Sequence, residues 1–485
     1  MRVVRSPIFS LWESCPALYY ATAALCGIAL FYGFYSPLLL FFTQPRYPQY
    51  WGFLLVATAM YGYCAYSSYR SVLPTEMTGV GYLQIVRIAK SPYHPQQKVY
   101  YGALSVFITK EGTFYHLPLS FVPAKALSLT ANQDYTVQVT VSPSNSGTYR
   151  CKIHSCQPVK GTVSLAQWRF TTKQALKQWV KKQAPHTYCR ALYNAFLTGE
   201  SENTLLSFLF ARVGLQHALA ISGFHYACLI ALLAYLLHYF FSRRVTASLL
   251  ILFCTGYLVF MGNTPSLCRA YIALIVYLLG YVLLRNANAL NSLGVALLLN
   301  LLIDPTLCRS IGFQLSYLAT FALITLTHPL QQLLSSLCPK RPWSSVSQWP
   351  FIEQLAYLGL RLFIQLMSVN LAIYLCLTPL LLGHFQLVTL SGLLYNLCIP
   401  PLLTITLALL LLSILCFPLA SYIFAINTIY TQWITHLLLY IPLPFNYSIP
   451  FRDMPTQTIV TWTLVCFLMG LFAYELKRID EKKPI

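Results

Sequence analysis

Charged residues are scarce in this chain. Lysine, arginine, aspartate and glutamate make up 9% of its 485 residues, whereas 57% are hydrophobic. A soluble globular domain carries about 25% charged residues, so the chain lacks the polar surface that keeps such domains in solution. Acidic residues are the scarcest, with 12 against 32 basic ones and a formal net charge of +20. We therefore expect a membrane protein that meets anionic lipid or nucleic acid.

Metal-ligand cysteine pairs are also missing. None of the fifteen cysteines has the C-x-x-C spacing of a zinc ribbon, and most lie inside apolar runs, where cysteine acts as a small hydrophobe. His217 and His225 are eight residues apart, which is a poor match to two ligands on one helix face. We expect no metal and no cofactor. Cys151 and Cys156 flank a polar stretch, and they are candidates for a disulfide in an oxidising compartment.

Long apolar runs enclose one polar insertion. We expect N-terminal spans in 1–69, a β domain in 70–163, a basic amphipathic segment in 164–213, a membrane domain in 214–475 and a cytoplasmic tail in 476–485. A spanning helix needs roughly 20 apolar residues, and the runs are sufficient for about 11 spans. The fold class is thus a polytopic α-helical membrane protein with a small all-β domain. No convincing cleavage site follows the apolar block at 17–42, so we interpret it as an anchor.

The insertion has the pattern of a small barrel. Its short runs alternate polar and apolar residues, as in 79–86 and 135–141, and Pro, Gly, Ser and Asn separate them. We expect about five strands in an OB-like fold. Barrels of this type often bind single-stranded nucleic acid, although a fold alone does not establish that function.

Basic residues gather in this domain and just after it. Between Tyr69 and Arg190 there are fifteen basic and three acidic residues, a formal balance of +12. This stretch is either a solvated surface beside a membrane or a face for nucleic acid. A helical stripe follows, formed by Arg169, Lys173, Lys177 and Lys181. A basic helix of this kind most often lies on anionic lipid, and direct contact with DNA phosphates is the alternative.

Short basic loops predict the orientation. Arg243-Arg244, Arg285, Lys340-Arg341 and the C-terminal tail fall in alternate loops, which the positive-inside rule places in the cytoplasm. The β domain is then extracytoplasmic. Arg2 and Arg5 favour a cytoplasmic N-terminus, which requires an odd number of spans before Tyr69. The sequence has two apolar blocks before Tyr69, and two spans are an even number, which conflicts with that requirement.

Polar residues inside the apolar runs form four motifs. They comprise Ser222, Gly223 and His225 in 217–225; Pro265 and Arg269 in 262–269; Asp304, Gln314 and Ser316 in 304–316; and Pro379, Asn396 and Pro400 in 378–401. Ionisable residues within spans are costly and usually functional. The structural alternatives are a hydrogen-bonded core histidine and an arginine that snorkels to the surface. Asp304 is a candidate partner of Arg269, and the prolines are expected to break helices and free carbonyls towards a cavity.

The order of these motifs resembles the ComEC family. It runs Ala-Ile-Ser-Gly-Phe-His, Pro-Ser-Leu-Cys-Arg-Ala, Asp-Pro with Gly-Phe-Gln-Leu-Ser, then Thr-Pro and Asn-x-x-x-Pro, over roughly 200–415. These are competence proteins of the bacterial inner membrane. The resemblance implies a multi-pass channel that passes single-stranded DNA into the cytoplasm during natural transformation. It gives pathway roles to Ser222, His225, Arg269, Asp304, Gln314, Ser316 and Asn396, and backbone-shaping roles to Gly223, Pro265, Pro305, Pro379 and Pro400.

The resemblance also implies partners. These are single-stranded DNA, membrane lipid, a separate DNA receptor, a nuclease and a cytoplasmic ATPase, with a homo-oligomer as a further expectation. No G-x-x-x-x-G-K-[ST] loop occurs in the chain, so the driving ATPase is expected to be another protein.

One family feature does not occur in the sequence. Many members end in a metallo-β-lactamase-like domain, whereas no His-x-His-x-Asp-His run is present here. We therefore expect a short form that is not an enzyme. The alternatives to DNA translocation are transport of another solute and a membrane scaffold that has lost transport.

Overall fold

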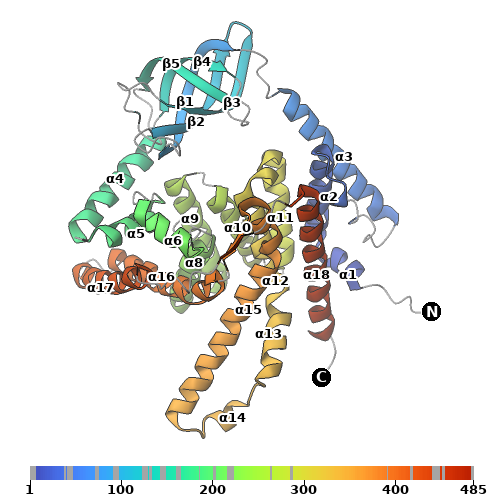
Figure 1. Cartoon of the computed structure of the whole chain (residues 1–485), viewed down its shortest axis with the longest axis vertical. Coiled ribbons are helices and arrows are strands. Elements are labelled where there is room, and N and C mark those ends of the chain that lie inside the picture. The colour runs from blue at the N-terminus through green and yellow to red at the C-terminus, as the bar shows by residue number, and fades with distance from the viewer. Residues whose placement is uncertain are drawn as a thin grey trace. The chain divides into compact units, whose positions relative to one another are not determined.

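The computed structural model describes residues 7–37, 40, 47–70, 76–90, 98–122, 129, 134–142, 149–159, 165–184, 186–199, 204–215, 223–262, 265–283, 288–389, 391–415, 419–439, 448–450 and 454–481. Contacts divide the chain into two compact units (Figure 1). The smaller unit is Ala65–Trp179 with Val259–Gly262. The larger unit is Met1–Cys64, Val180–Leu258 and Asn263–Ile485.

The smaller unit contains a closed five-stranded barrel. Its strands are β1 (Met77–Lys90), β2 (Lys98–Thr109), β3 (Gly112–Phe121), β4 (Asp134–Ser142) and β5 (Tyr149–Pro158), paired in the order β1-β2-β3-β5-β4 with β4 closing on β1. Neighbours are antiparallel except for β3 and β5. Alternate residues of each strand point inward, and Leu83, Leu104 and Phe107 are completely buried. The prediction of a small all-β domain is confirmed.

The barrel also tests the proposed disulfide. Cys151 and Cys156 lie five residues apart on the same strand, β5, and both are free. At about 3.3 Å per residue their Cα atoms are ~16 Å apart, whereas a disulfide needs less than about 7 Å. The predicted bridge is therefore wrong. Both thiols pack against the barrel core, and burial raises the pKa of Cys151 to about 12 and that of Cys156 above its ordinary value.

Helices make up the rest of the described chain. They are α1 (Pro7–Ser14), α2 (Pro16–Phe31), α3 (Tyr47–Arg70), α4 (Leu165–Gln183), α5 (Thr187–Thr198), α6 (Thr204–Arg212), α8 (Gly223–Phe240), α9 (Arg243–Met261), α10 (Pro265–Val282), α11 (Ala289–Ile303), the 3-10 helix η2 (Pro305–Arg309), α12 (Ile311–Thr325), α13 (Thr327–Leu337), α14 (Trp343–Val346), α15 (Phe351–Phe385), α16 (Ser391–Leu415), α17 (Ala420–Leu439) and α18 (Thr456–Glu481). Two short strands, β6 (Leu387–Thr389) and β7 (Ser448–Pro450), pair antiparallel.

Four of these helices are long and apolar enough to cross a membrane. They are α9, α15, α16 and α18, and a fifth span arises if α12 and α13, bent by 51° relative to each other, are counted together. The apolar helices α2, α8, α10 and α11 are shorter than the roughly 20 residues of a typical span. The chain is a mostly helical membrane protein, and the number of about 11 spans stays a prediction.

Glycines let three helices of the larger unit approach closely. A Cβ atom at Gly294 of α11 would overlap the backbone of Leu18 in α2, and one at Gly27 of α2 would overlap the carbonyl of Ala57 in α3. Small residues allow such close approach of backbones in membrane proteins. The same core continues through α12, α15 and α18 and supports the candidate site.

Candidate functional site: a buried arginine among membrane helices

Arg269 is a buried cation of the larger unit. It lies one turn into α10, which begins at Pro265, and proline is favoured in the first turn because the N–H that proline lacks would have no intrahelical partner there. The residue is only 6% exposed. Its guanidinium carbon lies 5.6 Å from the ring centroid of Phe313 in α12, and the hydroxyl of Tyr317 interacts with the charge. Nε and Nη1 have no hydrogen-bond partner among the described residues.

A buried amide completes this cluster. Asn300 of α11 donates from Nδ2 to the Tyr317 hydroxyl at 2.9 Å and to the carbonyl of Ala296 at 2.8 Å. Helices α10, α11 and α12 therefore bring polar groups to one place inside an apolar core. Sequence reasoning missed Asn300 and Tyr317. The sequence signal that could have identified Asn300 is an amide side chain within a run of leucines.

The expected partner of Arg269 has another role. Oδ1 of Asp304 accepts from the backbone N–H of Thr306 at 2.9 Å and from its hydroxyl at 2.6 Å, so the side chain caps η2. The suggested pairing with Arg269 is wrong, because no carboxylate of a described residue forms an ion pair with this arginine. The snorkelling interpretation also fails, since the guanidinium stays buried.

An unpaired buried cation is energetically costly. Desolvation of a charge costs several kcal/mol, whereas a desolvated cation–π contact returns only about 2 kcal/mol. The cluster is therefore suited to an anion or to water that would satisfy the free N–H groups. Such a site can attract and position negative charge.

The first motif lies beside this arginine. A Cβ atom at Gly223, the first residue of α8, would lie 3.3 Å from Cβ of Ala270, the residue after Arg269. Glycine thus permits α8 and α10 to touch at this level. Ser222 lies outside the described residues, as do the side chains of His225 and Pro265.

Gln314 connects α12 to α15. Its Nε2 donates to the carbonyl of Cys308 at 2.8 Å, and its Oε1 lies 3.4 Å from Nε2 of His384. The third and fourth motifs therefore meet through their side chains. Ser316 contributes a carbonyl that accepts from the Thr320 hydroxyl at 2.9 Å. Asn396 is half-buried on α16.

The prolines do not break their helices. Pro379 lies within α15, and Pro400 lies within α16. A proline frees the carbonyl four residues before it, and here the carbonyl of Leu375 accepts from the thiol of Cys466 in α18 at 3.7 Å. A neighbouring helix therefore satisfies the group that was expected to face a cavity.

Half of the basic stripe has a structural role inside the smaller unit. Lys173 is 5% exposed, and its Nζ donates to the carbonyl of Met261 at 3.1 Å. Arg169 donates from Nε to the carbonyl of Val259. These cations satisfy carbonyls in the last turn of α9, and Gly262, the residue after the helix, has a φ of 88°. The expectation that Lys173 binds DNA or lipid is therefore wrong. Arg169 has one of its nitrogens in a hydrogen bond. For Lys177 and Lys181, binding to DNA or lipid stays a prediction.

A second buried network was missed altogether. The hydroxyl of Tyr193 in α5 donates to Thr431 at 3.1 Å, and the hydroxyl of Thr431 donates to Asn427 at 3.4 Å. Nδ2 of Asn427 donates to the carbonyl of Thr406 at 3.1 Å. The network joins α5, α17 and α16, and α5 is mostly buried.

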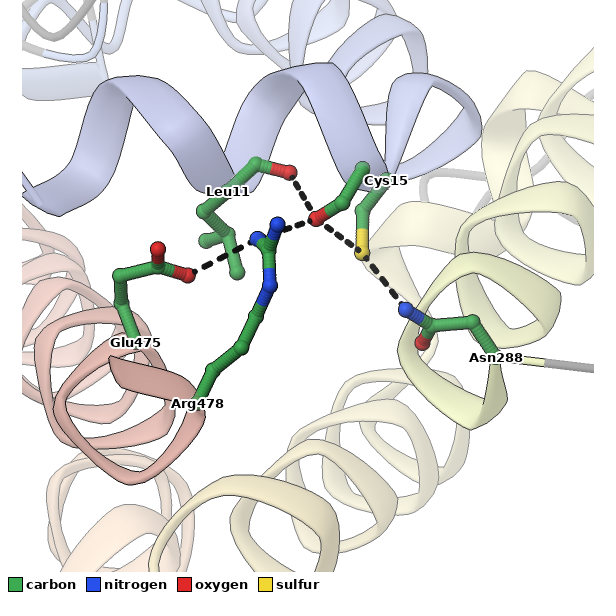
Figure 2. Close-up of polar contacts among 6 residues, drawn as sticks. Leu11, Cys15, Asn288, Glu475 and Arg478 are labelled. Carbon is green, nitrogen blue, oxygen red and sulfur yellow. Dashed lines mark hydrogen bonds and ion pairs between the residues drawn. The ribbon is translucent and has the colours of Figure 1, made fainter. Parts of the chain in front are cut away.

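A third cluster connects the two ends of the chain (Figure 2). Arg478 of α18 donates to Glu475 at 3.1 Å and to the hydroxyl of Ser14 at 2.8 Å. Nδ2 of Asn288, at the start of α11, donates to the thiol of Cys15 at 3.3 Å. Helices α1, α11 and α18 are thereby held together at one end of the larger unit.

Comparison with known proteins covers the region that contains these motifs. A family model described as "Competence protein" matches residues 201–478, more than half of the chain. "ComE operon protein 3" of Bacillus subtilis (strain 168) is 34% identical over 129 residues, which make up 26% of this chain and 17% of that protein. The match thus spans less than a fifth of the relative's length. No solved structure matches.

Proposed function

We propose that this chain, which belongs to the competence protein family, acts in DNA uptake and conducts single-stranded DNA across the bacterial inner membrane. The proposal includes a multi-pass arrangement of about 11 spans and an extracytoplasmic barrel of OB-like type. DNA and other components of the competence machinery are its partners, among them a receptor, a nuclease and a cytoplasmic ATPase.

The observation that carries the proposal is the unpaired charge of Arg269. A polyanion crosses a bilayer only along a route that offers hydration and positive potential. Arg269 supplies a fixed cation in an apolar helix cluster, with donors left open by the described residues. Gly223 and the Gln314–His384 contact lie on helices packed around it.

The outer face of the barrel supports DNA as the cargo. Tyr82 of β1 and Tyr115 of β3 both pair with Val106 of β2, so the three side chains share one face. The two tyrosines are 50% and 65% exposed. Bases of a single strand stack on such aromatics without regard to sequence, and the surrounding excess of basic residues suits the phosphates.

The N-terminal helices support an extracytoplasmic barrel. The contact of Ser14 with Arg478 holds α1 beside the basic end of α18, so both ends belong on the cytoplasmic side. Neither α2 nor α3 is among the four candidate spans, but α2 is an apolar helix of 16 residues. A single span through α2 gives the odd number that the basic N-terminus requires.

In this proposal the chain conducts DNA and performs no chemistry. Strand degradation and energy supply then come from partner proteins. Transport of a different solute and a scaffold without transport are the competing functions, and uptake of labelled DNA separates them.

The test is complementation of a knockout strain. Arg269→Ala is expected to reach the membrane at normal levels and to reduce DNA uptake and transformation at least a hundredfold, whereas Arg269→Lys should retain part of both. Arg244→Ala removes an exposed charge from α9 and is the matched control. Normal transformation by Arg269→Ala would exclude this role of the arginine.

A further inference from the structure

Helices α13, α14 and the first part of α15 form a hairpin that extends beyond the neighbouring helices of the larger unit (Figure 1). Large apolar side chains cover its surface. Phe351 and Ile352 are 77% and 79% exposed, and Leu333, Leu337 and Leu355 are exposed as well. Apolar surface of this extent marks a region that meets lipid or another molecule.

Four side chains form a ladder along the hairpin. The guanidinium of Arg341 lies 5.8 Å from the ring of Trp349, which makes an edge contact of 5.8 Å with Tyr357. At the other end of the ladder, the guanidinium carbon of Arg361 lies 4.9 Å from the ring centroid of Tyr357. The Tyr357 hydroxyl accepts from the backbone N–H of Arg341 at 3.0 Å, which joins the loop to α15.

The ladder concentrates positive charge without an acid to balance it. Lys340 and Arg361 both act electrostatically on the Tyr357 hydroxyl. Arg361 forms no ion pair with an acidic side chain in the part of the chain that the structure describes. Glu353 is the one acidic residue in 326–361, and it forms no ion pair with a described residue.

The position of the ladder matches the depth of lipid headgroups. Residues 362–383, which follow Arg361 in α15, carry no charged or histidine side chain. At 1.5 Å per residue they span about 33 Å, close to the ~30 Å hydrocarbon thickness of a bilayer. Arg361 therefore marks one edge of the hydrocarbon, and the exposed Lys340 and Arg341 lie in the adjoining hairpin.

We propose that Lys340 and Arg341 bind the phosphate of an anionic phospholipid, with Arg361 behind them as a fixed supporting charge. The aromatic ladder holds Arg341 and Arg361 in place, and the lipid acyl chains cover the exposed Leu333 and Leu337 of α13. A basic and aromatic border on an apolar surface is the combination that suits a membrane interface. Single-stranded DNA would leave the apolar surface exposed, so lipid is the occupant that fits both features.

The experiment uses the full chain extracted in mild detergent. Native mass spectrometry is used to count bound phosphatidylglycerol and phosphatidylcholine on the wild type and on Lys340→Gln/Arg341→Gln. Each basic residue near an anionic surface contributes about 1 kcal/mol, which is roughly fivefold, so the double variant should bind phosphatidylglycerol roughly 25-fold more weakly. Binding of phosphatidylcholine should not change.

Arg243→Gln/Arg244→Gln removes the same charge from the exposed start of α9 and is the control. Lys340→Gln alone changes one exposed side chain, cannot fail by unfolding the core, and should still weaken binding roughly fivefold. An equal loss in the α9 control, no loss in Lys340→Gln, or full competition by millimolar inorganic phosphate would overturn the proposal. Loss of single-stranded DNA binding with unchanged lipid binding would also overturn it. The result does not depend on DNA transport.

Discussion

At the scale of single residues, the cluster around Arg269 is held by the Tyr317 hydroxyl. This hydroxyl accepts from Asn300 and faces the buried guanidinium. Its removal leaves the second N–H of the amide without its partner, because the other N–H is taken by Ala296. An unsatisfied buried donor costs about 1–3 kcal/mol, whereas removal of both partners is close to neutral.

We therefore expect Tyr317→Phe to lower the thermal midpoint of the purified chain. The double variant Tyr317→Phe/Asn300→Leu should be less destabilised than Tyr317→Phe alone. Thermal unfolding in one detergent, followed by intrinsic fluorescence, measures the difference. A double variant as unstable as the sum of the two single variants would show that the amide and hydroxyl act independently.

The sequence identified a single residue correctly where the chemistry of its side chain alone makes it unusual. Arg269 stands out because a cation in an apolar run needs a reason wherever it lies. Lys173 was misjudged because helical spacing shows which residues share a face and not what covers that face. The covering carbonyl of Met261 is 88 residues away in the sequence. The Cys151–Cys156 pairing failed because one extended strand, β5, contains both cysteines and holds their Cα atoms too far apart.

At the scale of helices, the approach of α2 to α11 depends on Gly294. An added methyl would overlap the Leu18 backbone, so the two helices would have to separate. Overpacking of this kind costs typically 1–3 kcal/mol. Gly256 of α9 provides the matched control because its added methyl meets nothing within 4 Å.

Gly294→Ala should lower the thermal midpoint, whereas Gly256→Ala should raise it slightly, because alanine favours a helix by about 1 kcal/mol relative to glycine. Equal midpoints for the two variants would mean that α2 and α11 do not pack closely. Both variants replace glycine by alanine within a helix, so the difference between their midpoints cancels the intrinsic helix preference. What remains is the effect of the contact between α2 and α11.

Helix positions were predictable from apolar runs, but their continuity was not. The sequence predicts that the helices break at Pro379 and Pro400, whereas α15 and α16 continue through these residues. A proline removes one hydrogen bond locally, and whether the helix survives depends on a neighbour that satisfies the freed carbonyl. Cys466 provides that neighbour for α15 from a helix distant in the sequence.

At the scale of the whole molecule, the barrel and the helical unit have different tasks in the proposed function. The alternating pattern predicted the barrel, because each inward residue must be buried. The outer face could not be predicted, since the exposure of Tyr82 and Tyr115 on neighbouring strands depends on the pairing with Val106. That pairing brings two exposed tyrosines, 33 positions apart in sequence, to one face of the barrel.

The barrel face leads to a test of DNA binding by the full chain. Stacking of one base on an aromatic side chain contributes about 1–3 kcal/mol, so Tyr82→Ala/Tyr115→Ala should weaken binding of a fluorescent oligothymidine at least tenfold. Tyr235→Ala removes an exposed tyrosine from α8 and is the control. Binding should also weaken steeply with salt, because basic residues neutralise the phosphates. If Tyr82→Ala/Tyr115→Ala binds like the wild type, the barrel face does not receive DNA, and the basic residues of the smaller unit serve the membrane surface instead.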